Sequence, residues 1–207
     1  MVYIIGAGGH AKVIIDTLET LNEDIGGIYD EQTDSCLFRG YPVRGKFSDF
    51  LALNSGHYIL AIGSNLVRKK LFLKIGAPCS SVAVHPTAFI SNSVKIGSGS
   101  VVMANVSINA DSIVGNHAIV NTGASVDHDC ALGNFVHISP KAALAGNVLV
   151  GEGTHIGIGA VIIQGIKIGK WATIGAGAVV IRDVPDYAIV VGNPAKIIKF
   201  NQIQENE

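Results

Sequence analysis

One histidine of the chain stands directly between two carboxylates. In the segment VDHDC, His128 follows Asp127 and precedes Asp129. A carboxylate that accepts one ring N–H fixes the tautomer of an imidazole and raises its basicity, which suits a general base. Val126 is expected to point inward, so the imidazole two positions later should project outward. On its own the pattern also fits an ordinary surface histidine. Cys130 falls on a small inward position, where we expect a core residue and not a nucleophile.

A glycine-rich segment near the N-terminus could bind a diphosphate. Residues 6–11 read GAGGHA, which fits G-x-G-x-x-A between an apolar run and a helical pattern, and Asp30 follows about 20 residues on. Glycines let backbone N–H groups approach a pyrophosphate, and a helix N-terminus favours its charge. The surrounding unit is only about 80 residues long, so a mononucleotide diphosphate suits it better than NAD. A tight turn with a purely structural role is the remaining alternative.

The elements that must position these residues differ between the two halves of the chain. Short apolar runs predict buried strands, and helical spacing of apolar residues predicts helices. The predicted strands cover residues 2–5, 25–29 and 58–62, and the predicted helices cover 10–22 and 66–75. Alternation of these elements predicts a small Rossmann-like α/β domain with a mostly parallel sheet over residues 1–80.

The second half repeats an aliphatic residue at every sixth position. Sixteen consecutive positions, counted in sixes from Ile90 to Val180, are all Ile, Leu or Val. A slim residue stands four positions after each, and glycine often follows the aliphatic residue directly. Such a period is typical of a parallel β-helix with three hexads per coil, here over residues 85–200 and about five coils. We expect both rows to point inward and the glycines to supply the turn dihedrals.

Composition and charge exclude several classes of protein. The 207 residues carry a net charge of −1, which gives no electrostatic footprint for nucleic acid. The basic cluster 68–70 is expected to form a solvated helix face. Three widely spaced cysteines without a C-x-x-C motif argue against a disulfide framework and structural zinc. With no signal-peptide pattern and no apolar run of about 18 residues, we expect a cytoplasmic protein without membrane insertion.

Together these motifs resemble the hexapeptide-repeat acyltransferases, whose catalytic domain is a left-handed parallel β-helix. The chain is most similar to the sialic-acid O-acetyltransferase family and its PglD-like branch, which N-acetylates UDP-linked 4-amino sugars. The resemblance covers essentially the whole chain. It is carried by GAGGHAKV at 6–13, IYDE at 28–31, AIGSNLVRKKL at 61–71, NTGASVDHDC at 121–130 and VVGNPAKII at 190–198. It implies an acetyl-CoA-dependent N-acetyltransferase of a UDP-linked amino-deoxy sugar in bacterial surface-glycan biosynthesis, assembled as a homotrimer with active sites between subunits.

The resemblance also implies roles for single residues. His128 would be the base, and Asp129 would raise its basicity, with Asp127 as the alternative. The nucleotide sugar would contact Gly8, Gly9, His10, Asp30, Glu31 and Gly63, with Asn121 beside the acceptor. Acetyl-CoA would contact His137, Ile158 and Ala176.

Other interpretations remain open at this point. O-acetylation of sialic acid or another sugar, N-acetylation of a GDP-linked amino sugar, and a non-catalytic sugar-nucleotide binder all fit parts of the pattern. A zinc site of His117, His128 and His137 is not expected, because the three occupy the fourth, third and sixth positions of their hexads. His155 lies one coil beyond His137 and should stack on it.

Overall fold

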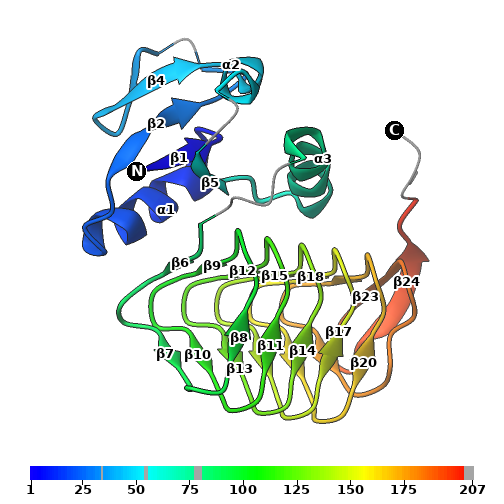
Figure 1. Cartoon of the computed structure of the whole chain (residues 1–207). Coiled ribbons are helices and arrows are strands. Elements are labelled where there is room, and N and C mark those ends of the chain that lie inside the picture. Colours follow the sequence, from blue (N-terminus) through cyan, green and yellow to red (C-terminus); the bar gives the residue numbers. More distant parts are fainter. Residues whose placement is uncertain (34, 54–55, 77–80, 203–207) are drawn as a thin grey trace.

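The computed structural model describes residues 1–207 apart from 34, 54–55, 77–80 and 203–207. An α/β unit precedes a column of short strands, which confirms the predicted fold class (Figure 1). None of the helices in the described part of the chain is long and apolar enough to cross a membrane.

The N-terminal unit contains a five-stranded sheet with the order β3-β4-β2-β1-β5. Its elements are β1 (Val2–Ile5), α1 (Gly9–Thr20), β2 (Ile25–Tyr29), β3 (Leu37–Phe38), β4 (Tyr41–Gly45), α2 (Phe47–Leu51), β5 (His57–Leu60) and α3 (Asn65–Ile75). Strand β3 pairs antiparallel with β4, and the other pairs are parallel. The predicted strands and helices are confirmed to within two residues. The β3–β4 hairpin and α2 were not predicted, because β3 has only two residues and β4 contains Pro42.

From Ala83 the chain winds into a parallel β-helix with three faces. The first face holds β6 (Ala83–Val84), β9 (Val101–Val102), β12 (Ile119–Val120), β15 (His137–Ile138), β18 (His155–Ile156), β21 (Thr173–Ile174), β23 (Ala188–Val191) and the antiparallel β24 (Lys196–Phe200). The second holds β7 (Phe89–Ile90), β10 (Ser107–Ile108), β13 (Ser125–Val126), β16 (Ala143–Leu144), β19 (Val161–Ile162) and β22 (Val179–Val180). The third holds β8 (Lys95–Ile96), β11 (Ile113–Val114), β14 (Ala131–Leu132), β17 (Leu149–Val150) and β20 (Lys167–Ile168).

Both predicted inward rows form the interior of the column. Aliphatic residues such as Ile138 and the slim residues four positions later, such as Ala142, are buried in one cluster. Polar members of the slim row are satisfied by the neighbouring coil. The Ser100 hydroxyl, for example, donates to the carbonyl of Gly115 at 2.7 Å and accepts the N–H of Ala118 at 2.9 Å. The hexad pattern therefore fixes the core without leaving this buried hydroxyl unpaired.

The prediction that glycines after the aliphatic residues supply the turn dihedrals is wrong. Gly115 is not among the residues with positive φ, but a Cβ on it would lie 2.6 Å from the backbone nitrogen of Asn134 in the next coil. Left-handed conformations occur two positions further on, at residues such as Asp111 (φ 62°) and Asp129 (φ 59°). Close approach of successive coils, not backbone freedom, selects glycine here.

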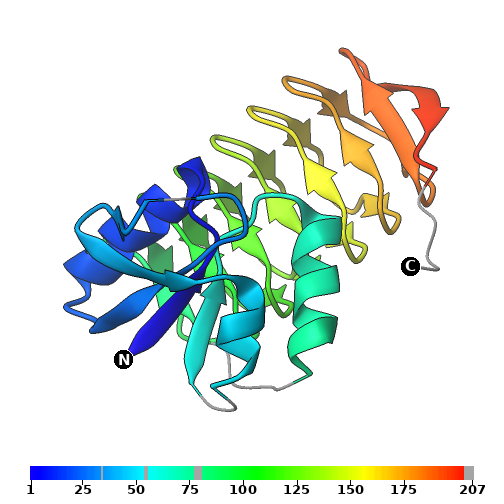
Figure 2. The same ribbon diagram turned by 90° about the horizontal axis from the view of Figure 1, so that it is seen from above.

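The two units meet at the first face of the column. Ala11 and Ile15 of α1 share a buried cluster with Met103 and Ile119. Seen from above, the N-terminal unit covers the early coils, and the later coils extend beyond it (Figure 2).

Arg68 contradicts the expectation of a solvated basic face. Its side chain is buried, and its guanidinium donates to the carbonyls of His117 and Phe135, both at 2.8 Å, and of Ile62 at 2.9 Å. Asn65 donates to the carbonyl of Gly153 at 2.9 Å. Residues 117, 135 and 153 stand one coil apart, so α3 binds a row of backbone carbonyls along one corner. This row fixes the loop after β5 against the column.

Candidate active site

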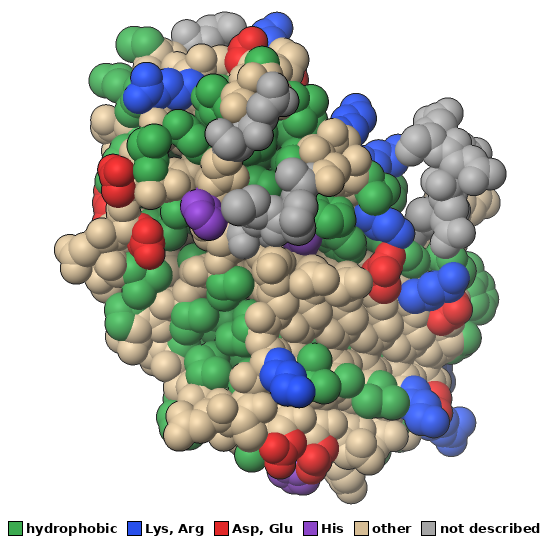
Figure 3. All heavy atoms as spheres, viewed as in Figure 1, with side chains coloured by type: hydrophobic (Ala, Val, Ile, Leu, Met, Phe, Trp, Pro, Cys, Tyr) green, Lys and Arg blue, Asp and Glu red, His purple; other side chains and the backbone are tan. Residues whose placement is uncertain are grey.

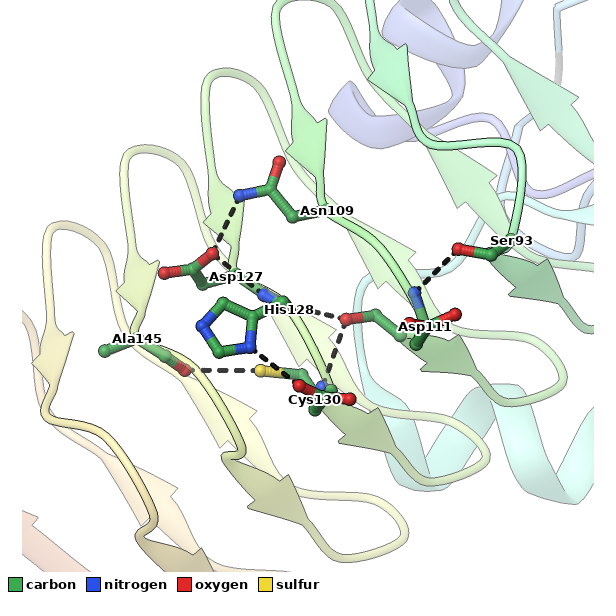
Figure 4. A network of polar contacts seen from close by, with 9 residues as sticks. Ser93, Asn109, Asp111, Asp127, His128, Cys130 and Ala145 are labelled. Carbon is green, nitrogen blue, oxygen red and sulfur yellow. Dashed lines mark hydrogen bonds and ion pairs between the residues drawn. The ribbon is translucent and has the colours of Figure 1, made fainter.

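His128 lies at the corner between β13 and β14, where the second and third faces meet (Figure 4). Its side chain is 59% exposed, and its Nδ1 lies 2.7 Å from Oδ2 of Asp129. Asp127 instead accepts the backbone N–H of His128 and the Nδ2–H of Asn109, each at 2.8 Å. Asp129 therefore orients the ring, and Asp127 holds the backbone that carries it. Cys130 is buried with its Sγ 3.3 Å from the carbonyl of Ala145, which confirms its core position.

Both neighbouring carboxylates act on the charge of His128. The hydrogen bond to Asp129 raises the pKa of His128 most, and the charge of Asp127 adds to this. The hydrogen bond from Asn109, followed by that from the His128 backbone, lowers the pKa of Asp127, so this acid stays ionised. Because Asp129 takes Nδ1, the nitrogen left to accept a proton is Nε2.

A cavity of about 660 Å³ opens at the carboxyl ends of β1, β2 and β5, and we call it the glycine-loop cavity. All six residues assigned to the nucleotide sugar line it: Gly8, Gly9, His10, Asp30, Glu31 and Gly63. A Cβ on either Gly8 or Gly9 would meet nothing within 4 Å. Both glycines therefore leave room above the start of α1, where backbone N–H groups and the helix dipole favour an anion.

Asp30 ties the glycine loop to the end of β2. Its Oδ2 accepts the N–H of Ala7 at 2.8 Å, and its Oδ1 accepts those of Gln32 at 2.8 Å and Thr33 at 2.9 Å. Glu31 accepts the N–H of Phe47 at 3.2 Å. A carboxylate has about four lone-pair sites, so both acids keep acceptor capacity toward a ligand.

Three histidines cluster between this cavity and the first face of the column. The rings of His137 and His155 stack with centroids 4.8 Å apart and planes at 11°, as predicted, and the ring of His10 lies 6.4 Å from His137. Burial lowers the pKa of His10 to about 4 and that of His137 to about 3. Both are therefore neutral at ordinary pH. The Nε2 of His10 is buried without a hydrogen-bond partner in the described chain.

Asn121 fixes the tautomer of His137. The amide oxygen of Asn121 accepts the N–H of Thr122 at 2.8 Å, so its Nδ2 is the group that lies 3.2 Å from Nε2 of His137. Nε2 then accepts from this amide, which leaves the ring proton on Nδ1, and a hydrogen bond with the backbone of Gly63 opposes the fall in the pKa of His137. Asn121 thus contacts His137 and lies one corner away from His128.

The predicted residues divide into two groups on one chain. Ile158 and Ala176 occupy equivalent positions one coil apart, at the same corner as Asn121 between the first and second faces. This corner borders the first face, which carries His137 and whose early coils meet the N-terminal unit. His128 and Asp129 lie at the corner opposite the first face. A single chain therefore does not bring His128 to the glycine-loop cavity.

The three histidines weighed as a zinc site do not converge. His117 is buried between the rings of Phe72 and Phe135, with centroids at 4.5 and 5.4 Å, and burial lowers its pKa to about 4. His137 faces the cavity side and His128 the opposite corner. No group of three His, Cys, Asp or Glu residues suited to a metal occurs among the residues that the structure describes.

Sequence reasoning missed two contributors to the site. Asn109 anchors Asp127 from one coil before, and the signal for it is its spacing of 18 residues from Asp127. Arg68 donates hydrogen bonds to the backbone carbonyls of Ile62 and Gly63 in the loop after β5. Its sequence context, a run of three basic residues, gave no sign that its side chain is buried.

A β-helix of hexads joined to a glycine-loop α/β unit defines a hexapeptide-repeat acyltransferase. The PglD N-terminal domain profile matches residues 1–75, and the bacterial transferase hexapeptide (six repeats) profile matches 147–182. A mutant of perosamine N-acetyltransferase from Caulobacter crescentus, solved with CoA and GDP-perosamine, is 45% identical over 96% of both chains, with a TM-score of 0.91. The acetyltransferase domain of PglB from Neisseria gonorrhoeae, solved with acetyl coenzyme A, is 40% identical over 95% of this chain and 98% of that one, with a TM-score of 0.88.

Two curated relatives match over shorter stretches. UDP-N-acetylbacillosamine N-acetyltransferase from Bacillus subtilis is 38% identical over 116 residues, which is 50% of this chain and 51% of the relative. The uncharacterized protein L142 of Acanthamoeba polyphaga mimivirus is 36% identical over 111 residues, 54% of this chain and 23% of its own length. The chain thus spans at most about half the length of these two relatives. With the full-length structural matches, the chain belongs to the PglD-like family of hexapeptide-repeat sugar N-acetyltransferases.

Proposed function

We propose that the protein transfers an acetyl group from acetyl-CoA to the amine of a nucleotide-linked 4-amino sugar. One observation carries this proposal. The same chain contains the glycine-loop cavity and, on its hexapeptide column, an exposed histidine that a carboxylate orients. The Caulobacter relative, which was solved with CoA and GDP-perosamine, supports both kinds of substrate.

The chemistry follows from the protonation state of the acceptor. A sugar amine at neutral pH is largely ammonium and becomes nucleophilic only when a proton leaves. That first proton passes to solvent. Nε2 of His128 accepts a second proton from the nitrogen as the neutral amine attacks the thioester carbonyl, and Asp129 stabilises the resulting imidazolium. The tetrahedral intermediate then breaks its C–S bond, and the departing thiolate takes up the proton from His128. No covalent bond to the enzyme is needed.

The proposal also concerns which nucleotide carries the amino sugar. The sequence motifs favour a UDP-linked sugar, as in the name of the Bacillus relative, which matches half of this chain. A GDP-linked sugar is the second candidate, and it is supported by the Caulobacter relative, which matches 96% of this chain. A CoA-release assay against UDP- and GDP-linked 4-amino sugars, with sialic acid as the O-acetyl acceptor, tests both. Release with sialic acid alone would overturn the N-acetyltransferase proposal.

We also propose a homotrimer in which His128 of one subunit faces the glycine-loop cavity of the next. The placement of His128 at the corner opposite the first face supports it. So do hydrophobic side chains exposed on the column, some of them gathered over the side seen in Figure 3. The large ones include Phe89, Ile113, Leu149, Ile158 and Val161.

Subunit complementation tests this arrangement separately from light scattering. His128→Ala and Gly8→Val each remove one half of the proposed shared site. When equal amounts of the two inactive variants assemble at random, roughly a quarter of all sites should regain activity, because one site in each mixed trimer receives an intact half from both neighbours. A monomer in solution, or mixed trimers without activity, would contradict the shared site.

A further inference from the structure

Gly146 lies against the imidazole of His128, one coil further along the column. A Cβ on Gly146 would stand 2.6 Å from both Cε1 and Nε2 of His128, and 3.2 Å from Nδ1. Nonbonded carbon atoms have their optimal separation at about 3.5–4.0 Å. The ring in its present place and a side chain at position 146 therefore exclude each other.

The backbone itself does not require glycine at this position. Gly146 is absent from the residues with positive φ, so an alanine there would carry no backbone strain. The equivalent positions one coil before His128 and one coil after Gly146 are Ala110 and Gln164, which both carry side chains. The corner thus accepts a Cβ in other coils, and the feature that excludes one at Gly146 is the His128 ring.

We propose that Gly146 is a positioning residue for His128. Its missing side chain provides the surface on which the ring lies while Nδ1 reaches Asp129. Because the ring is 59% exposed, that surface and the bond to Asp129 set its orientation. A methyl group at position 146 would turn the ring about its side-chain torsions and break the Nδ1 contact. The expected effect of this change on turnover rests on the proposed function, whereas its expected effect on the position of the His128 ring does not.

Gly146→Ala should leave the column folded, because the group that must move is a mobile side chain. We expect kcat to fall roughly 10- to 100-fold, less than the loss of the base itself, with the KM for both substrates unchanged. Ala110→Ser, which adds one atom at the same corner a coil earlier, is the matched control and should keep wild-type kcat. In a His128→Ala background, Gly146→Ala should cost nothing further.

An NMR titration of His128 in the substrate-free protein separates the two proposals. In Gly146→Ala, the pKa of His128 should fall toward its ordinary value of about 6.5 as the contact with Asp129 is lost. An unchanged pKa together with unchanged kcat would overturn the role of Gly146. If no nucleotide sugar in the panel is acetylated, the proposed function fails, and the titration still decides the position of the ring.

The melting temperature gives a second test of the clash. Should Gly146→Ala lower the melting temperature, adding His128→Ala to this variant should restore it. A melting temperature that stays low would place the clash elsewhere and overturn the proposal.

Discussion

Histidines in opposite surroundings lie on the two sides of this column. His128 is exposed and bound to Asp129, which raises its pKa, whereas burial lowers the pKa of His10 to about 4 and that of His137 to about 3. Of these three histidines, His128 is therefore the one poised to change its charge near neutral pH. If a neighbouring subunit completes the site, its His128 brings a basic nitrogen to the neutral imidazoles of His10 and His137.

This contrast predicts the pH dependence of kcat/KM. A general base must be deprotonated, so activity should rise with pH through an ionisation above the ordinary histidine value of about 6.5. In Asp129→Asn the limb should move to lower pH, because the largest cause of the raised pKa is removed. Asp127→Asn should move it less. Profiles of the three proteins with a saturating second substrate measure this, and an unmoved limb in Asp129→Asn would contradict the assigned contact.

The buried histidines make a separate prediction about acid stability. An unfolded histidine takes up a proton near pH 6.5, whereas His10, His117 and His137 do so only at about 4, 4 and 3 when folded. Below about pH 6.5 the unfolded chain binds more protons, so the free energy of unfolding falls as the pH drops. His117→Phe keeps an aromatic ring against Phe72 and Phe135 and should reduce the fall in melting temperature between about pH 7 and about pH 5. Equal falls in wild type and variant would refute it.

At the scale of elements, the hexads decide the fold through contacts between coils. Gly115→Ala places a methyl group 2.6 Å from backbone atoms of the next coil, which cannot move aside as a side chain can. We expect a loss of about 1–3 kcal/mol in the free energy of unfolding. Gly159→Asn is the control, because Gly159 is a left-handed turn position with open space, and asparagine tolerates that conformation. Denaturant unfolding of both variants measures the difference, and equal losses would show that turn dihedrals matter more than coil contacts.

The same contrast shows what sequence can and cannot predict for these elements. A period of six is local and repeats, so the core rows from Ile90 to Val180 were predictable. The reason for the glycines was not, because the clash involves a residue in the next coil. Arg68 was mistaken for a surface residue because its acceptors, the carbonyls of His117 and Phe135, belong to distant coils. Backbone carbonyls leave no signal in side-chain patterns.

At the scale of the whole molecule, the candidate site residues form two separate groups on one chain. The sequence motifs of both groups could be recognised, but neither motif shows that the two groups lie apart in space. The signal was present in the spacing of His128 and His137, since nine residues are half a coil and place them on different sides. The row of carbonyls held by Arg68 and Asn65 fixes the glycine-loop group relative to the column.

The glycine-loop half can be tested on its own. Gly8 has a φ of −87° and open space at its Cβ position, so Gly8→Val should fold. The added side chain would enter the cavity where the diphosphate is proposed to bind. We expect a large rise in the KM for the nucleotide sugar with little change for acetyl-CoA. If both constants stay at their wild-type values, the loop is only a structural turn.

The most direct test of the central claim is the turnover of His128→Ala. The side chain is exposed and takes no part in the core, so the variant should fold and bind both substrates, as titration calorimetry can verify. Its kcat on the nucleotide-linked amino sugar should fall roughly 10²–10⁴-fold, the usual contribution of a general base. Near-normal turnover at about pH 7 would contradict the account and assign the proton to another acceptor, such as His10, His137 or water.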